Sequence, residues 1–260
     1  MYSIERYHFA ASLEEAYELV KKSARNRVFG GGTWLRLGKP RLSTAIDLSR
    51  LGLNTITETD EAVKIGASVT LRQLETSEIL KKNFGGALSA CVAPIVGVQF
   101  RNMATVGANV YSRAGFSDII PVLLALDASV TLFGAGEMSV QAFLRSDIKR
   151  DILTEITVPK RGQNAVALSH RRTATDFPQL TVCMSRTADG EYRLAVGARP
   201  GRAVLCESAA ALLKAGQPEQ AAKNVQENVS FDGNLRGSAE YRRALAGVLT
   251  VRAWNALREG

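Results

Sequence analysis

The sequence predicts an α+β protein, and three patterns along the chain lead to this prediction. In the first half, helices with capping signals alternate with short apolar strands. After Pro159, segments of alternating apolar and polar residues predict antiparallel strands, with Asp189-Gly190 as a hairpin turn. The last part of the chain keeps an apolar face at helical spacing, which predicts a helix that packs on the core or on another subunit through Tyr241, Leu245, Val248, Leu249 and Ala253. The length of 260 residues allows one large domain or two smaller ones.

Residues 1–54 are predicted to form a small α/β unit. Ser12 and Glu15 form a capping box that opens a helix. A short strand then leads into a run of three glycines, which lets a ligand approach the backbone closely and lets N–H groups turn towards it. Phosphate is the ligand that such loops most often bind. A plain tight turn is an equally good interpretation, because the spacing fits neither the dinucleotide fingerprint nor the P-loop.

Residues 55–158 are predicted to form a second α/β unit. Thr70 and Gln73 repeat the capping box, and Ser117 caps another helix with Asp118 in its first turn, where a carboxylate suits the positive helix end. Between them, the small residues 105–109 predict a loop that offers hydroxyl, amide and backbone donors to an anion. Two such loops would hold one pyrophosphate from both sides.

The composition, 46% hydrophobic and 22% charged, is typical of a soluble globular protein. No apolar run reaches the roughly 20 residues needed to span a bilayer. The N-terminal segment lacks the layout of a signal peptide, so we expect a cytoplasmic protein without a membrane partner. The net charge is +8, but the basic residues are scattered and no nucleic-acid-binding motif is present. Solvated surfaces explain this charge, with an anionic cofactor or an acidic partner as the alternative.

The three cysteines, Cys91, Cys183 and Cys206, are widely spaced and include no C-x-x-C pair. The pattern predicts buried free thiols and no zinc or iron–sulfur centre in this chain. His8 and His170 are the only histidines and lie too far apart to suggest a metal site.

In the order and spacing of its motifs, the chain resembles the FAD-binding (medium) subunits of molybdenum hydroxylases, the family of xanthine dehydrogenase and carbon monoxide dehydrogenase. The resemblance covers nearly the whole chain. The segments that carry it are residues 30–33, 65–67, 70–74, 101–109, 117–118, 124–128, 152–156, 176–178 and 237–242.

This resemblance implies a fold shared with vanillyl-alcohol oxidase and related flavoproteins. An FAD-binding domain is expected at residues 1–158, with subdomains at about 1–54 and 55–158, and a C-terminal domain at 159–260 would close over the flavin. FAD is the implied cofactor. The implied partners are a molybdopterin-binding large subunit and a [2Fe–2S] small subunit, with NAD+ or another oxidant as the electron acceptor.

The resemblance also implies individual contacts. The loop from Arg27 to Trp34 would contact the FAD pyrophosphate through its backbone, and residues 105–109 would hold the other side. Asp118 would bond a sugar hydroxyl or the adenosine side, Ile95 would line the cofactor channel, and Leu153 would pack against the adenine or ring system. The implied cofactor-binding residues are Arg27, Val28, Phe29, Gly30, Gly31, Gly32, Thr33, Trp34, Ile95, Thr105, Val106, Gly107, Ala108, Asn109, Asp118 and Leu153. No side chain is expected to be catalytic or to bind a metal.

The chain departs from the family pattern at three places. Ala108 stands where a glycine is usual, and Trp34 is bulkier than usual; we expect Trp34 to fill core, with stacking on the cofactor as the alternative. No lysine occurs at residues 168–170, so Arg171 or Arg172 is the candidate for a positive charge beside the flavin. Two other functions therefore stay open: a stand-alone flavin reductase of the same fold, and a degenerate scaffold subunit that no longer binds FAD.

Overall fold

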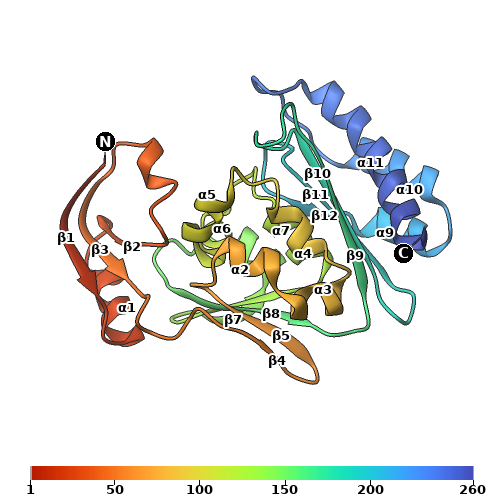
Figure 1. Ribbon diagram of the computed structural model, residues 1–260. Coiled ribbons are helices and arrows are strands. Elements are labelled where there is room, and N and C mark those ends of the chain that lie inside the picture. Colours follow the sequence, from red (N-terminus) through yellow and green to blue (C-terminus); the bar gives the residue numbers. More distant parts are fainter. Residues whose placement is uncertain (1, 260) are drawn as a thin grey trace.

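The computed structural model describes residues 2–259, which form three sheets, each covered by helices (Figure 1). A parallel sheet near the N-terminus is followed by a mixed helical and antiparallel unit in the centre and by an antiparallel sheet with helices at the C-terminal end. The predicted α+β fold, with two N-terminal α/β subdomains and a C-terminal domain of antiparallel strands and helices, is confirmed.

The first subdomain is a three-stranded parallel sheet in the order β1-β3-β2, packed on one helix. Its elements are β1 (Ser3–Phe9), α1 (Leu13–Lys22), β2 (Asn26–Val28), the 3₁₀ helix η1 (Leu35–Leu37) and β3 (Arg41–Asp47). Ser12 caps α1 by accepting the N–H of Glu15 at 3.2 Å. The Glu15 carboxylate reaches back one residue further than predicted, to the N–H of Ala11 at 2.6 Å. The capped helix buries Ala16 and Val20.

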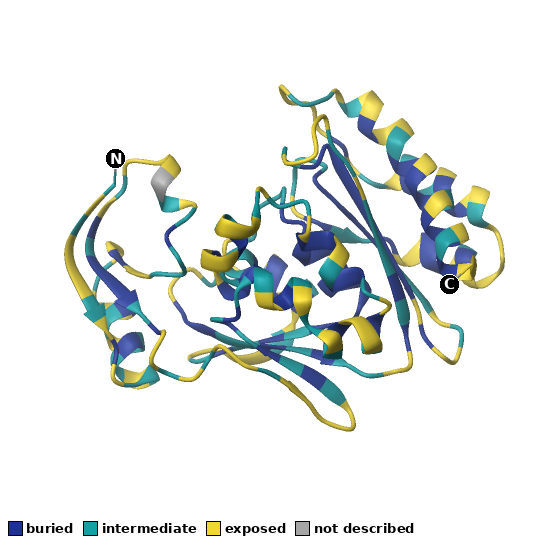
Figure 2. Cartoon of the chain, viewed as in Figure 1, coloured by how far each residue is buried: buried dark blue, intermediate teal, exposed yellow. Residues whose placement is uncertain are grey.

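The second subdomain holds the largest core, between a five-stranded sheet in the order β4-β5-β8-β6-β7 and a set of short helices. Its strands are β4 (Ile56–Glu58), β5 (Ala62–Gly66), β6 (Ser129–Leu132), β7 (Gly136–Ser139) and β8 (Leu153–Pro159). Its helices are α2 (Leu71–Thr76), α3 (Glu78–Phe84), α4 (Ala87–Val92), α5 (Val98–Met103), α6 (Val106–Tyr111), α7 (Ile119–Ala125) and α8 (Val140–Arg145). Every residue of α7 is buried, because this helix packs against the antiparallel sheet of the C-terminal domain and against α4, α6 and α8 (Figure 2).

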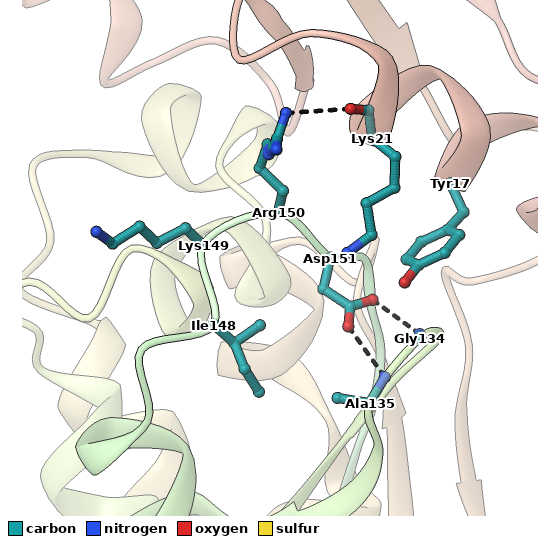
Figure 3. Close-up of a pocket in the computed structure, with 8 residues that line it drawn as sticks. All are labelled: Tyr17, Lys21, Gly134, Ala135, Ile148, Lys149, Arg150 and Asp151. Atoms are coloured by element: carbon teal, nitrogen blue, oxygen red, sulfur yellow. Dashed lines mark hydrogen bonds between the residues drawn. The ribbon is translucent and has the colours of Figure 1, made fainter.

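A cavity of about 430 Å³ lies where the first two subdomains meet (Figure 3). The Asp151 carboxylate accepts the N–H groups of Gly134 and Ala135, at 2.8 and 3.0 Å, which fixes the β6–β7 turn. Arg150 donates to the carbonyl of Lys21 at the end of α1, at 3.1 Å. This cavity includes no residue of the glycine loop, and its carboxylate is already fully bonded, so we treat it as a structural joint.

The C-terminal domain is an antiparallel sheet in the order β12-β11-β10-β9. Its elements are β9 (Asn164–His170), β10 (Leu180–Arg186), β11 (Tyr192–Gly197), β12 (Val204–Leu205), α9 (Glu207–Lys214), α10 (Pro218–Asn228) and α11 (Ala239–Glu259). In β10, Val182 packs with the C-terminal helices, whereas Cys183 packs into the central core. Both faces of this strand are therefore covered. All three cysteines are buried free thiols, as predicted.

The predicted apolar face of the last helix is only partly correct. Leu249 and Ala253 are buried, but Tyr241 and Val248 are exposed. Helical spacing alone did not separate the side that packs on β10 from the flank that faces solvent.

Arg242 is almost fully buried, with 1% of its surface exposed. Its guanidinium donates to the carbonyls of Gln179, Asp232 and Gly237 and to Oδ1 of Asn234, at 2.7–2.8 Å. Arg242 therefore ties α11 to the start of β10 and to the turn before the helix. These bonds give a structural reason for the family-like segment at residues 237–242.

Replacing Arg242 by alanine should lower the free energy of unfolding by about 3 kcal/mol, because buried oxygens lose their donor and a cavity remains. Urea denaturation measures this loss. The exposed neighbour Arg243 is the matched control, and Arg243→Ala should change stability by less than about 0.5 kcal/mol. Equal losses in the two variants would contradict the assigned role of Arg242.

Candidate functional site

The glycine loop leaves the parallel sheet directly after β2. Phe29 still bonds to the sheet, since its N–H donates to the carbonyl of Ile46 at 2.8 Å. Beyond this point, the N–H groups of residues 30–34 donate to no acceptor within residues 2–259. Gly31 and Gly32 have φ angles of +71° and +66°, in the left-handed region that favours glycine. The loop therefore presents a run of free N–H donors, which is the arrangement that binds anions.

The loop packs directly against the segment that the sequence paired with it. A Cβ atom on Gly30 would lie 2.6 Å from Thr105 Oγ1 and 2.7 Å from Ala108 Cβ. On Gly31 it would lie 1.9 Å from the carbonyl oxygen of Met103. Such distances are too short for any side chain, so glycine is required at both positions for the two segments to meet. Ala108 occupies the space that the missing side chain of Gly30 leaves.

The second segment is a helix, and the predicted loop at residues 105–109 is wrong. Thr105 caps α6, and the N–H groups of Val106, Gly107 and Ala108 all have acceptors within the chain. These acceptors are Val69 O at 2.8 Å, Ala67 O at 2.9 Å and Thr105 Oγ1 at 3.3 Å. The backbone of this segment therefore has no free donors in its first turn. The Thr105 hydroxyl, which accepts as a cap, keeps its own hydrogen for donation.

Asn109 connects α6 to the start of α7. Its side-chain carbonyl accepts the hydroxyl hydrogen of Ser117 at 2.6 Å, and Ser117 Oγ in turn accepts the N–H of Ile120 at 3.3 Å. Ser117 thus makes a cap bond to the first turn of α7, and Asn109 holds it in place, but Asp118 is the N-cap residue and does not lie in the first turn as predicted.

Asp118 is buried, with 7% of its surface exposed, and it pairs with Arg171 from the end of β9. Burial raises the pKa of Asp118 to about 6, although Arg171 opposes the shift. Arg171 also donates to the carbonyl of Asp176 at 2.6 Å. The structure therefore couples the proposed sugar-binding carboxylate to the C-terminal domain. Since Arg171 is neutralised by Asp118, Arg172, which is exposed, is the better candidate for a positive charge near the flavin.

Trp34 does not fill the core, contrary to our expectation, because 54% of its surface is exposed. Its ring lies 5.0 Å from that of Phe116 and 6.1 Å from that of Phe177, and Arg236 stacks over Phe177 at 4.8 Å. These rings come from the glycine loop, the second subdomain and the C-terminal domain. Sequence reasoning missed Phe116, because a single aromatic residue in a loop belongs to no periodic pattern.

The remaining residues that the resemblance implies as cofactor-binding lie outside the contact between the glycine loop and α6. Arg27 and Val28 are exposed residues of β2, paired with β3. Ile95 is half-buried after α4, where its carbonyl accepts from Arg101 at 3.0 Å. Leu153 is buried in the central core at the start of β8. Their predicted contacts with the cofactor stay predictions.

Comparison with known families accounts for this arrangement of loops and domains. Residues 2–161 match the family described as the FAD binding domain in molybdopterin dehydrogenase. The chain belongs to this family. Residues 164–257 match the CO dehydrogenase flavoprotein C-terminal domain. Family membership confirms the predicted resemblance, the FAD cofactor and the class of FAD-dependent oxidoreductase, whereas the domain boundary at 158/159 stays a prediction.

Similar proteins span almost the whole chain. The glyceraldehyde dehydrogenase medium chain of Sulfolobus acidocaldarius is 28% identical over 95% of this chain and 96% of its own length. The xanthine dehydrogenase FAD-binding subunit of Escherichia coli O157:H7 is 26% identical over 96% and 94%. A crystal structure of the Cu,Mo-CO dehydrogenase matches with a TM-score of 0.89 at 23% identity, covering 100% of this chain and 99% of that one, which shows the same fold. Within residues 2–259, no helix has the length and apolar character needed to span a bilayer.

Replacing Gly31 by alanine should abolish FAD retention, because the added Cβ meets the carbonyl of Met103 and displaces the loop. Gly52 is the matched control, since it also has a φ of +71° but has open space around its α-carbon. Both variants carry the same backbone strain, of about 1 kcal/mol. Flavin absorbance per chain after gel filtration is the measurement. Equal flavin content in Gly31→Ala and Gly52→Ala would contradict the assigned role of the loop.

The raised pKa of Asp118 predicts a pH-dependent stability. An acid whose pKa rises from 3.8 to about 6 on folding holds its proton more tightly in the folded chain. Its stabilising contribution is therefore present below about pH 4 and is lost as the pH rises through about 6. The Asp118→Asn variant has no titrating group at this position. Its free energy of unfolding, relative to that of the wild type, should therefore increase by up to about 3 kcal/mol as the pH rises from below about 4 to above about 6. Urea denaturation of both proteins at equal flavin content and at several pH values tests this prediction. A difference in unfolding free energy between the variant and the wild type that stays constant with pH would refute it.

Proposed function

We propose that this chain is the electron-transfer subunit of a molybdenum hydroxylase complex, taking electrons from a [2Fe–2S] partner subunit and passing them to NAD+ or another acceptor. The observation that carries the proposal is the free N–H run of residues 30–34, held against the Thr105 hydroxyl. This geometry suits a pyrophosphate, the most highly charged part of FAD.

The residues of the chain bind and position the cofactor. The N–H groups of residues 30–34 would donate to the pyrophosphate from the glycine loop, and the Thr105 hydroxyl would donate from α6. FAD held there would supply the redox chemistry. The chain itself contributes position and electrostatics, so no side chain is assigned as an acid or a base. The Trp34 ring at the end of the glycine loop packs against Phe116 and Phe177, which brings aromatic surface from all three parts of the chain to this side of the loop.

The names of similar proteins support a heteromeric assembly. Nicotine 6-hydroxylase of Paenarthrobacter nicotinovorans has a medium subunit that is 26% identical to this chain over 92% of both proteins. A 6-hydroxypseudooxynicotine dehydrogenase complex subunit of the same organism is 29% identical over 59% of this chain. We therefore propose that a molybdopterin-binding large subunit and a [2Fe–2S] small subunit complete the enzyme.

Purification of the tagged chain from its native source tests this assembly. We expect a complex that contains flavin, molybdenum and iron in constant ratio across the gel-filtration peak. Its flavin absorbance should bleach on addition of the complex's reducing substrate and return on addition of an acceptor. A chain that elutes alone with flavin and oxidises a nicotinamide donor by itself would favour the stand-alone reductase. A chain that elutes in the complex without flavin would favour the scaffold.

A further inference from the structure

A second ligand-sized cavity lies away from the glycine loop. It has a volume of about 800 Å³ and is lined by residues of α7, α8, β12, α9 and α10, so that both the second subdomain and the C-terminal domain contribute to it. Small-molecule sites typically measure about 300–1,000 Å³. No residue of the glycine loop or of α6 lines this cavity.

The lining of this cavity carries an excess of positive charge. Arg145, Arg199 and Arg202 all line it, and none of them forms an ion pair with a carboxylate within residues 2–259. The acidic residue in the lining is Glu207, which accepts from Gln141 Nε2 at 3.4 Å. The lining therefore keeps a net positive charge, because it holds three arginines and one glutamate.

Two of the arginines are held in place by backbone oxygens. Arg199 donates through Nε to the carbonyl of Arg202 at 2.8 Å and through Nη1 to the carbonyl of Ser230 at 2.7 Å. Arg202 donates through Nη1 to the carbonyl of Leu144. The remaining guanidinium N–H groups have no acceptor among the described residues. These donors are thus fixed in position before any ligand arrives, which lowers the entropic cost of binding.

A further arginine adds to the positive charge nearby. Arg113 donates to the carbonyl of Ile148 at 2.9 Å, and its buried Nε has no acceptor in the described chain. Burial lowers the pKa of Arg113, and the positive charge of Arg202 lowers it further. Positive charges that repel one another across a partly buried space are stabilised by an anion.

The lining of the cavity also includes apolar side chains. Leu124, Val204 and Val225 line it beside the thiol of Cys206. A ligand that fills the cavity therefore needs a charged head for the arginines and an apolar or planar body for these apolar side chains. Guanidinium groups bind phosphate through paired N–H donors, which favours phosphate as the head.

We propose that this cavity binds a phosphate-bearing small molecule of nucleotide size, with its phosphate on Arg145, Arg199 and Arg202 and its body against Val204 and Val225. This site is separate from the flavin site and does not depend on the proposed electron transfer.

Isothermal titration of the FAD-loaded chain with ADP, and separately with inorganic pyrophosphate, tests the proposal. We expect saturable binding at one site per chain. Arg145 makes no described bond within the protein, so Arg145→Ala should fold normally and weaken binding about tenfold or more. Arg202→Ala should weaken it as well, with thermal melting to confirm folding. Arg252, an exposed arginine of α11 outside the cavity, is the control, and Arg252→Ala should bind like the wild type.

Three results would overturn the proposal. The first is the absence of binding by either probe, which would also follow if the arginines serve an acidic segment of a partner protein. The second is equal affinity in Arg145→Ala and Arg252→Ala. The third is release of FAD from the chain during the titration, measured as flavin in the filtrate after ultrafiltration, because the probe would then be occupying the flavin site.

Discussion

The close contact between the glycine loop and the start of α6 is the constraint on which the site depends. Gly30 and Gly31 lie so near to Met103, Thr105 and Ala108 that no side chain fits between them. This contact joins the parallel sheet of the first subdomain to the core of the second. The N–H groups of residues 30–34 are free of acceptors among the described residues, whereas those of Val106, Gly107 and Ala108 at the start of α6 are already bonded. One segment therefore supplies the donors, and the other supplies the surface that positions them.

The C-terminal domain is tied to the same site by polar and aromatic contacts. The buried pair of Asp118 and Arg171 joins the start of α7 to the end of β9. The exposed ring of Trp34 meets Phe116 and Phe177 beside this pair. A buried ion pair contributes little net stability, because both charges lose their hydration. Its value here is geometric, since it fixes how the C-terminal domain lies over the flavin-binding half of the chain.

Local signals in the sequence predicted much of the fold, and tertiary contacts decided the rest. The cap at Thr70 and the alternating strands depend on neighbouring residues, so they could be recognised without a structure. The small residues 105–109 predict a loop, because a helix of six residues is too short to show helical spacing. The exposure of Trp34 and the pairing of Asp118 with Arg171 could not be predicted, since each depends on residues more than 50 positions away.

Hydrogen exchange with and without FAD tests the central claim most directly, because it reports on individual backbone N–H groups. The free donors of residues 30–34 should exchange quickly in the flavin-free chain and slow down when FAD binds. The N–H groups of Val106, Gly107 and Ala108 are bonded in either case, so FAD should change their exchange little. Unchanged exchange at residues 30–34, or new protection confined to the start of α6, would contradict the assignment of the glycine loop as the pyrophosphate donor.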